Sequence, residues 1–383
     1  MDSLAPILHQ TFDSEASELI DFAERPLPVG QSLLSAMCAR HIGTSIGVFR
    51  VGVRRRMRAS GNMETLDVLV KIKPTDSVLI SAGTELATQC DAELGRLYAR
   101  YSPKRELGRS HLREVALYRN PRPGLAAHMP RVHGVIVDAK QGLWISVLEY
   151  LGEAELLADM STTNQWTLAH FEAAVDALAD IHAEHFDDEA RLLSEPWIAL
   201  NAEGSQVLAM REWWQTLARF AGRNYDDSAL RDLATRHDRL VADIDSWWPA
   251  LCALPRTLIH NDFNPRNLGF RRTANGPVLC AFDWELATLG VPQHDLAELL
   301  VFALPANADR RWVDHLLERH HNRLAKRVGP RWTPDEWRRG FDLSLNHLLI
   351  DRLAMYALPH AFKPLPYLAR ILANWVRLHR WIA

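Results

Sequence analysis

The hydrophobic pattern of the chain changes its period near Gly152, and this change limits the folds that the chain can adopt. Before Gly152, four segments are rich in β-branched residues or alternate between apolar and polar residues, which is typical of strands. They are residues 47–56, 66–73, 132–138 and 143–149. After Gly152, apolar residues recur at helical spacing, as in the run from Phe171 to His182. The sequence therefore predicts a sheet-rich N-lobe, a short linker at about 149–152 and a helix-rich C-lobe.

Further elements can be placed within this outline. Between residues 76 and 101 the pattern is mixed and predicts one helix, near 84–101. In the second half of the chain, Gly and Pro residues punctuate long helical stretches. The remaining expected elements are helices at 109–119, 206–222 and 228–248, strands at 256–260 and 278–282, and helices beyond 294 with breaks near Gly329-Pro330 and from Pro364 to Pro366.

Composition places the chain among globular enzymes. A length of 383 residues suits two lobes, and 48% apolar with 24% charged residues is ordinary. The net charge of −3 provides no overall field that would favour nucleic acid or a membrane as a partner. Four cysteines without CxxC spacing indicate free thiols in a reducing compartment. Because the first residues lack a signal-peptide pattern and no apolar run reaches about 18 residues, we expect a cytoplasmic protein.

The charge is unevenly distributed along the chain. Residues 307–383 contain 14 Lys and Arg and 7 Asp and Glu, whereas residues 187–250 contain 7 basic and 12 acidic residues. Such segments are usually solvated helix faces, and they can also shape a substrate pocket. A polycationic acceptor would favour carboxylates around it, and the basic last segment argues the other way. A neutral or modestly charged alcohol is therefore the expected acceptor.

Two polar clusters follow short apolar strands. The first is the turn HNDFNPRN at 260–267, and the second contains Asp283, after the strand 278–282. If the strands are related as in a hairpin, Asn267 and Asp283 come together as a hard-oxygen pair suited to Mg²⁺. Asp262 would stay free of the metal, orient a hydroxyl and accept its proton, as phosphoryl transfer requires. These residue types also cap ordinary turns, but three of them at this spacing favour a catalytic loop.

Three motifs resemble the aminoglycoside phosphotransferase/choline kinase family of kinase-like small-molecule phosphotransferases. They are His260-x-Asp262-x4-Asn267, Asp283-Trp284-Glu285 and Asp295-Leu296-Ala297. The resemblance covers about residues 40–305. It implies an α+β, bilobal, protein-kinase-like fold, in which residues 1–149 form a nucleotide-binding N-lobe with an antiparallel sheet and a helix. Residues 150–383 would form a mostly helical C-lobe with the catalytic loop and the substrate-binding helices.

The resemblance also implies roles for single residues. The implied roles are Asp262 as the catalytic base, Asn267 and Asp283 as Mg²⁺ ligands, Glu285 as an acidic position that sometimes helps with the metal, and His260 and Asp295 as residues that brace the site. Arg266, beside Asn267, could reach the γ-phosphate or an anionic substrate, and could equally be solvated. His182 lies on an apolar helical stripe, so we interpret it as a core histidine and not as a ligand.

The N-lobe should supply a lysine for the nucleotide. Strand 66–73 places Lys71 and Lys73 on one face, and geometry alone does not choose between them. The family pattern, VLVK followed shortly by a proline, favours Lys71 as the residue that binds the α- and β-phosphates. The helix 109–119 resembles the glutamate helix of the family, so Glu114 would pair with Lys71 and hold it extended. Taken singly, each of these residues could be an ordinary surface side chain.

Two further nucleotide contacts rest on position alone. Residues 43–47 (GTSIG) lie where the family has a phosphate-covering loop, which would place Ser45 near the nucleotide. Two glycines with Ser and Thr are also ordinary turn chemistry. The strand 143–149 leads into a stretch that matches the linker of the family, where backbone groups of Glu149 and Leu151 would bind adenine.

These features predict an ATP-dependent phosphotransferase that moves the γ-phosphate of ATP to a hydroxyl of a small molecule, with ATP and Mg²⁺ as cofactors. The expected partner is a small-molecule alcohol, with no nucleic acid and no membrane, and the protein would be a monomer or a homodimer. The alternative is a catalytically silent, kinase-like module that binds nucleotide or regulates another protein. Phosphorylation of proteins ranks below both, because no Ala-Pro-Glu signature follows Asp283.

Overall fold

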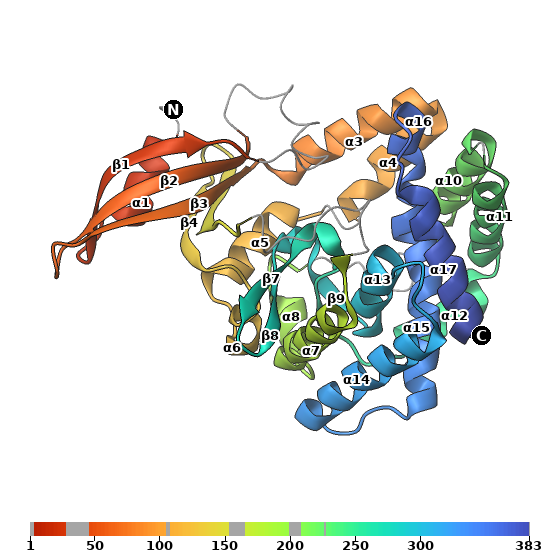
Figure 1. Ribbon diagram of the computed structural model, residues 1–383. Helices are drawn as coiled ribbons and strands as arrows, with labels where there is room; N and C mark the ends of the chain where they lie inside the picture. Colours follow the sequence, from red (N-terminus) through yellow and green to blue (C-terminus); the bar gives the residue numbers. More distant parts are fainter. Residues whose placement is uncertain are drawn as a thin grey trace.

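The computed structural model describes residues 4–27, 46–104, 108–152, 165–198, 208–225 and 227–382. It confirms the α+β class, with an antiparallel sheet in the first part of the chain and helices in most of the remainder (Figure 1). Five strands form the sheet in the order β1-β2-β3-β5-β4, and each neighbouring pair is antiparallel. The strands are β1 (Ser17–Arg25), β2 (Gly47–Met57), β3 (Met63–Lys73), β4 (Val132–Asp138) and β5 (Leu143–Glu149).

The two faces of β3 contact different parts of the protein. Val68, Val70 and Ile72 are buried in an apolar cluster with residues of α1 (Ala5–Phe12). Because successive side chains alternate between faces, Lys71 and Lys73 project to the opposite side. On that side lies α5 (Ser110–Arg119), which contacts β4, β5 and the short turn 284–286. The alternation therefore directs both lysines toward the second half of the chain.

Residues 76–101 form two helices, so the prediction of a single helix near 84–101 is wrong. The helices are α3 (Asp76–Cys90) and α4 (Ala92–Tyr101). Asp91 between them has an extended backbone, and its side chain accepts the N–H groups of Glu93 and Leu94 at the start of α4. An aspartate in this position caps a helix N-terminus, which interrupts a pattern that is otherwise continuous.

The second half is mostly helical, and the expected breaks near Gly329-Pro330 and Pro364 to Pro366 are confirmed. The helix predicted at 228–248 is in fact two helices that meet at Asp243, and the start of the one predicted at 206–222 falls partly outside the described residues. None of the described helices is long and apolar enough to span a membrane. The helices are α7 (Leu168–Glu184), α8 (Glu189–Ser194), α10 (Arg211–Asn224), α11 (Ser228–Ala242), α12 (Ile244–Cys252), α13 (Gln293–Ala303), α14 (Arg310–Val328), α15 (Pro334–Leu348), α16 (Ala357–Phe362) and α17 (Leu368–Ile382).

Part of the basic charge of residues 307–383 is neutralised by ion pairs between α14 and α7. Arg319 donates two hydrogen bonds of 2.8 Å to Asp176, and Arg323 bonds to Asp180 at 2.7 Å. These arginines are therefore engaged between helices and do not determine the charge of a pocket near Asp262.

Two small hairpin-like sheets carry the polar clusters. In one, β6 (Thr257–Ile259) pairs with β9 (Thr288–Gly290); in the other, β7 (Leu268–Thr273) pairs with β8 (Gly276–Ala281). The sequence predicted β6 and β8 but not their partners, of which β9 has three residues and β7 contains a glycine and two arginines. Figure 1 shows β7, β8 and β9 between α5 and α13.

Candidate active site

The predicted catalytic loop, residues 260–267, follows β6 and is organised by its own side chains. Asp262 accepts a 2.8 Å hydrogen bond on Oδ1 from the Nδ2 of Asn264, and a 2.7 Å hydrogen bond on Oδ2 from the Nδ2 of Asn267. Asn261, with a φ of 59°, is in the left-handed region and turns the chain just ahead of Asp262. Both carboxylate oxygens are thus fixed in direction, while 17% of the side chain stays exposed.

Asp295, from α13, holds the start of this loop. Its buried carboxylate accepts the backbone N–H groups of His260 at 2.7 Å and Asn261 at 2.8 Å, and the Nε2 of His182 lies 3.1 Å away. Burial raises the pKa of Asp295, but the hydrogen bond and charge of His182 outweigh this and hold the pKa below its ordinary value. His260 also reaches the second cluster, because its Nε2 lies 3.0 Å from the carbonyl oxygen of Phe282.

The β7–β8 hairpin brings the chain at Asn267 next to the chain at Asp283. The N–H of Phe282 donates to the carbonyl oxygen of Asn267 at 3.0 Å, which continues the strand pairing by one residue. Because the Nδ2 of Asn267 is engaged with Asp262, its amide oxygen is the atom that can ligate a cation. Asp283 also has a left-handed backbone, with a φ of 64°, and its Oδ1 accepts a 2.6 Å hydrogen bond from the Nζ of Lys71.

Two lysines and three carboxylates form an ion-pair cluster between β3, α5 and the second polar segment. The Nζ of Lys71 lies 2.9 Å from Glu114 and 2.6 Å from Asp283. Lys73 is buried, and its Nζ bonds to the carboxylate of Glu285. Burial lowers the pKa of Lys71, but the charges of Asp283, Glu114 and Glu285 reverse this and raise the pKa well above its ordinary value. The two lysines thus have different nearest partners, although Lys71 also lies 3.8 Å from Glu285 and Lys73 lies 3.7 Å from Glu114.

The donor set of this region fits a magnesium ion. Carboxylate oxygens of Glu114, Asp283 and Glu285 lie within 4.8 Å of one another, and Mg²⁺ prefers carboxylate and amide oxygens. Glu114 and Glu285 already face the two lysine ammonium groups, which neutralise their charge. Asp283 also accepts a hydrogen bond from Lys71, on its Oδ1, so its Oδ2 and the amide oxygen of Asn267 are the candidate donors for the cation.

The segment expected to bind adenine follows β5. The N–H of Glu149 donates to the carbonyl oxygen of Arg131 at 2.8 Å, and its carboxylate accepts a 2.8 Å hydrogen bond from Arg271. An adenine contact at Glu149 would therefore have to use its carbonyl oxygen. Leu151 is buried, and Ser45 lies outside the described residues.

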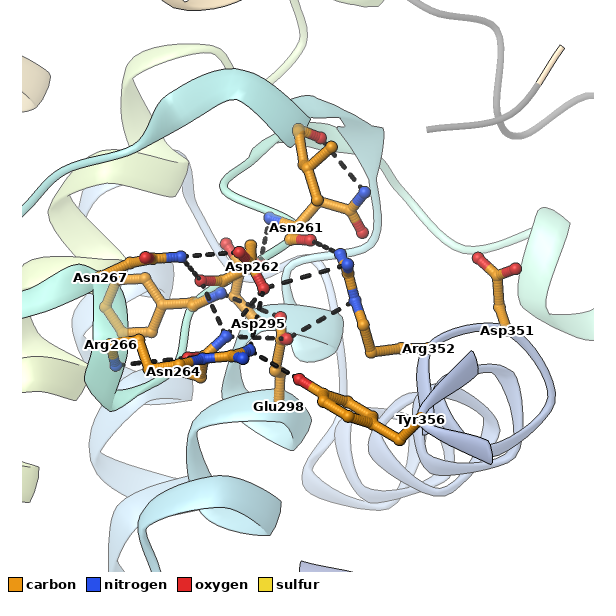
Figure 2. A network of polar contacts seen from close by, with 12 residues as sticks. Asn261, Asp262, Asn264, Arg266, Asn267, Asp295, Glu298, Asp351, Arg352 and Tyr356 are labelled. Atoms are coloured by element: carbon orange, nitrogen blue, oxygen red, sulfur yellow. Dashed lines mark hydrogen bonds and ion pairs between the residues drawn. The ribbon is translucent and has the colours of Figure 1, made fainter. Parts of the chain in front are cut away.

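Side chains from late in the chain complete the surroundings of Asp262 (Figure 2). Arg352 lies in a π-helical turn, Leu349–Leu353; its Nη2 donates to the loop backbone, and its Nη1 lies 4.0 Å from Oδ1 of Asp262. The Nη2 of Arg266 lies 4.0 Å from the same oxygen and donates a 2.6 Å hydrogen bond to the hydroxyl of Tyr356. Burial raises the pKa of Asp262, yet the charges of Arg352 and Arg266 outweigh it and keep the pKa below its usual range. Asp262 is therefore ionised at neutral pH.

Glu298, one turn after Asp295 on α13, supports the middle of the loop. Its Oε2 accepts the N–H of Phe263 at 2.9 Å, and its Oε1 lies 3.8 Å from the Nε of Arg352. Burial raises the pKa of Glu298 to about 8, because the charge of Arg352 compensates only part of the cost and Asp262 adds repulsion. This carboxyl group therefore keeps its proton to a higher pH than an ordinary glutamate does.

Comparison with known proteins identifies the relatives of this chain. A sequence model described as the phosphotransferase enzyme family matches residues 90–331. The chain belongs to this family. The matched span contains Glu114, both polar clusters and Asp295, whereas Lys71 and Arg352 lie outside it. A search among curated proteins found no match.

Solved structures of phosphotransferases are similar to this family member at low identity. A glucosamine kinase is 14% identical with a TM-score of 0.45, over 89% of this chain and 97% of that chain. Choline kinase LicA from Streptococcus pneumoniae is 12% identical with a TM-score of 0.42, over 100% and 96%. Wild-type aminoglycoside 2'-phosphotransferase-IIIa, in its GDP complex, is 10% identical with a TM-score of 0.45, over 98% and 99%.

The residues of this phosphotransferase site that were not predicted from the sequence lie far along the chain from Asp262. Arg352 and Tyr356 follow Asp262 by about 90 residues, in a stretch whose main pattern is helical. The available signal is their i, i+4 spacing, which places a cation and a phenol on one helical face. Glu298 could have been noticed three residues after Asp295, on the same face of α13. Nothing in the local sequence links either signal to the loop at 260–267.

Proposed function

We propose that this phosphotransferase moves the γ-phosphate of ATP to a hydroxyl group of a small molecule, with Asp262 as the base. We also propose that residues 1–149 bind the nucleotide and that residues 150–383 bind the acceptor. The observation that supports this best is the arrangement around Asp262. Its Oδ2 is held by Asn267, beside the hairpin end that carries Asp283, and Asp283 is bonded to Lys71. A base, two cation donors and a lysine are what phosphoryl transfer needs in one place.

Asp262 would act mainly by orienting the acceptor hydroxyl. Its lowered pKa makes it a weak base at the start of the reaction. Phosphoryl transfer proceeds through a loose transition state with little bond formation to the attacking oxygen. The hydroxyl becomes strongly acidic only as its bond to phosphorus forms, so a weak base that accepts the proton late is sufficient. The two asparagine hydrogen bonds keep the carboxylate in place for this step.

The other residues would bind and orient the nucleotide. Lys71 would contact the α- and β-phosphates, and Glu114, 2.9 Å from its Nζ, would hold it extended. Asn267 and Asp283 would hold Mg²⁺, which when bound neutralises the charge of the phosphates. Glu285 would serve as the partner of Lys73 and not as a metal ligand. His260 and Asp295 would keep the loop in register with α13.

The test is phosphate transfer to a panel of hydroxyl compounds, followed by detection of ADP and of the phosphorylated product. We expect turnover that needs Mg²⁺, and thermal stabilisation of the protein by Mg-ATP. Asp283→Asn should lose both, whereas Asp227→Asn, at an exposed helix cap, should keep both. Stabilisation by nucleotide without any product would favour the silent module. A protein that shows neither property would contradict the proposal.

A further inference from the structure

Two guanidinium groups stand on one side of the proposed base. Oδ2 of Asp262 is bonded to Asn267, on the side of Asp283 and the lysines. Oδ1 lies 4.0 Å from Arg352 and 4.0 Å from Arg266. The arginines therefore lie on the other side of Asp262 from the proposed nucleotide-binding residues. An acceptor whose hydroxyl reaches Asp262 would come next to them.

Both arginines are held in place and still reach solvent. The Nη2 of Arg352 donates to the loop backbone, and Arg266 donates to the side-chain oxygens of Asn264 and Tyr356. Their side chains are 14% and 36% exposed, whereas Arg113, which donates to the carbonyl oxygens of Glu285 and Gly108, is completely buried. A guanidinium fixed in this way is a preorganised donor for a carboxylate or phosphate, whose oxygens match its fork geometry.

The groups beside Asp262 that reach solvent include two cations. Arg352 and Arg266 lie 4.0 Å from its Oδ1 and are partly exposed, whereas the carboxyl groups of Asp295 and Glu298 are completely buried and accept backbone N–H groups of the loop. Two guanidinium groups on the accessible side would repel an ammonium group and attract an anion.

The backbone at Arg352 is also unusual. Residues 349–353 form a π-helical turn between α15 and the start of the next helix. Such turns are rare, and they occur frequently at functional sites because they widen the helix and redirect a side chain. Here the turn carries the side chain that reaches from the last helices of the chain to Asp262 (Figure 2).

We propose that the acceptor carries an anionic group, a carboxylate or a phosphate, near the hydroxyl that receives the γ-phosphate, and that Arg352 and Arg266 bind this group. This inference rests on the proposed function, because it concerns the acceptor of that reaction. In the reaction, the acceptor oxygen forms a bond to the γ-phosphorus, the bond from that phosphorus to the β–γ bridging oxygen of ATP breaks, and the hydroxyl proton passes to Asp262. The products are ADP and an acceptor that carries a new phosphate ester as well as its original anion.

The experiment compares acceptors of one carbon skeleton that differ in charge. Glycerol, glycerate and glycerol phosphate form one set, and glucose, gluconate and glucose 6-phosphate form another; ethanolamine and choline represent cations. With Mg-ATP at saturation, we expect kcat/KM for the best anionic compound to exceed that for its neutral counterpart by about 10- to 100-fold, which a charge-assisted bidentate contact provides. The carboxylate and phosphate members of each set distinguish the two sources of the anion.

Variants show whether the arginines cause this preference. Arg352→Gln should lower kcat/KM for the anionic acceptor about 10- to 100-fold and leave KM for ATP unchanged, and Arg352→Lys should restore part of the loss. Arg319→Gln, whose arginine pairs with Asp176 on α7, should change neither value. A rise in KM for ATP in place of the acceptor effect would assign Arg352 to the nucleotide and overturn the inference.

The wild-type panel separates this inference from the proposed function. Turnover of neutral or cationic acceptors, without turnover of their anionic counterparts, would refute the anionic acceptor and leave the phosphotransferase intact. No transfer from Mg-ATP to any member would contradict both. Because this comparison uses the wild-type protein, it holds even if an arginine variant fails to fold.

Discussion

Replacing Asp295 by asparagine should destabilise the protein more than its small change in shape suggests. The two carboxylate oxygens accept the N–H groups of His260 and Asn261 at 2.7 and 2.8 Å, and the residue is completely buried. In Asp295→Asn, one oxygen becomes an NH₂ group that faces a backbone N–H. A buried donor left without an acceptor costs about 1–3 kcal/mol, and the other hydrogen bond loses its charge assistance, worth roughly 1 kcal/mol. The expected loss is about 2–4 kcal/mol.

Urea unfolding, followed by tryptophan fluorescence, measures this loss. A lower midpoint with an unchanged slope would show a change in stability alone. Asp227→Asn is the matched control, because Asp227 also accepts two backbone N–H groups but at an exposed helix start, where asparagine is an equally good cap. The control should stay within about 0.5 kcal/mol of the wild type.

The dependence on pH provides a second check on the same substitution. The pKa of Asp295 is lowered in the folded protein, so its ionised form stabilises the fold above the unfolded pKa of about 3.9. This stabilisation is lost as the pH falls toward the folded value, so the gap between wild type and variant should narrow below about pH 4. A variant that loses no more stability than the Asp227→Asn control at neutral pH would refute the reasoning.

Two further predictions concern buried ionisable groups. Lys73→Met should cost on the order of 1–3 kcal/mol in unfolding experiments, because buried Glu285 loses its nearest cation and keeps Lys71 at 3.8 Å; adding Glu285→Gln should recover part of this loss, and strictly additive costs would contradict the pairing. Glu298, whose pKa is raised to about 8, binds a proton in the folded state that the unfolded state has released, so wild-type stability should fall as the pH rises from about 5 to 8. Glu298→Gln should remove this decline in urea midpoints, and an unchanged pH profile would contradict it.

The sequence predicted the parts of the site whose residues are close together in the chain. The turn at 260–267 and Asp283 lie within 24 residues of each other and follow apolar strands. Asn267 does lie beside Asp283, but the hairpin responsible is β7–β8, because the two predicted strands, β6 and β8, pair with β9 and β7 and not with each other. Four of the five strands of the N-terminal sheet were also predicted from their β-branched or alternating residues, whereas β1 (Ser17–Arg25) was not. What the family resemblance added was a role for each side chain, and those roles stay predictions until activity is measured.

The parts that were missed depend on contacts that no local pattern encodes. A single aspartate, Asp91, ends α3 and starts α4, because capping of Glu93 and Leu94 outweighs a continuous helical pattern. From the sequence, Lys73 could have been a solvated lysine and an alternative to Lys71. In the structure it is buried and pairs with Glu114 of α5 and with Glu285 after β8. Arg352 reaches Asp262 from a π-helical turn, and the position of such a turn depends on tertiary packing.

Phosphate transfer by Asp262→Ala, together with binding of Mg-ATP to the same variant, tests the central claim most directly. Asp262 touches the proposed reacting centre, whereas Lys71 and Asp283 are the proposed nucleotide contacts. We therefore expect the transfer rate to fall about 10²- to 10⁴-fold, which is the usual contribution of a general base. The affinity for Mg-ATP should stay within about threefold of the wild type. Transfer at a rate within tenfold of the wild type would contradict the assignment of Asp262 as the base.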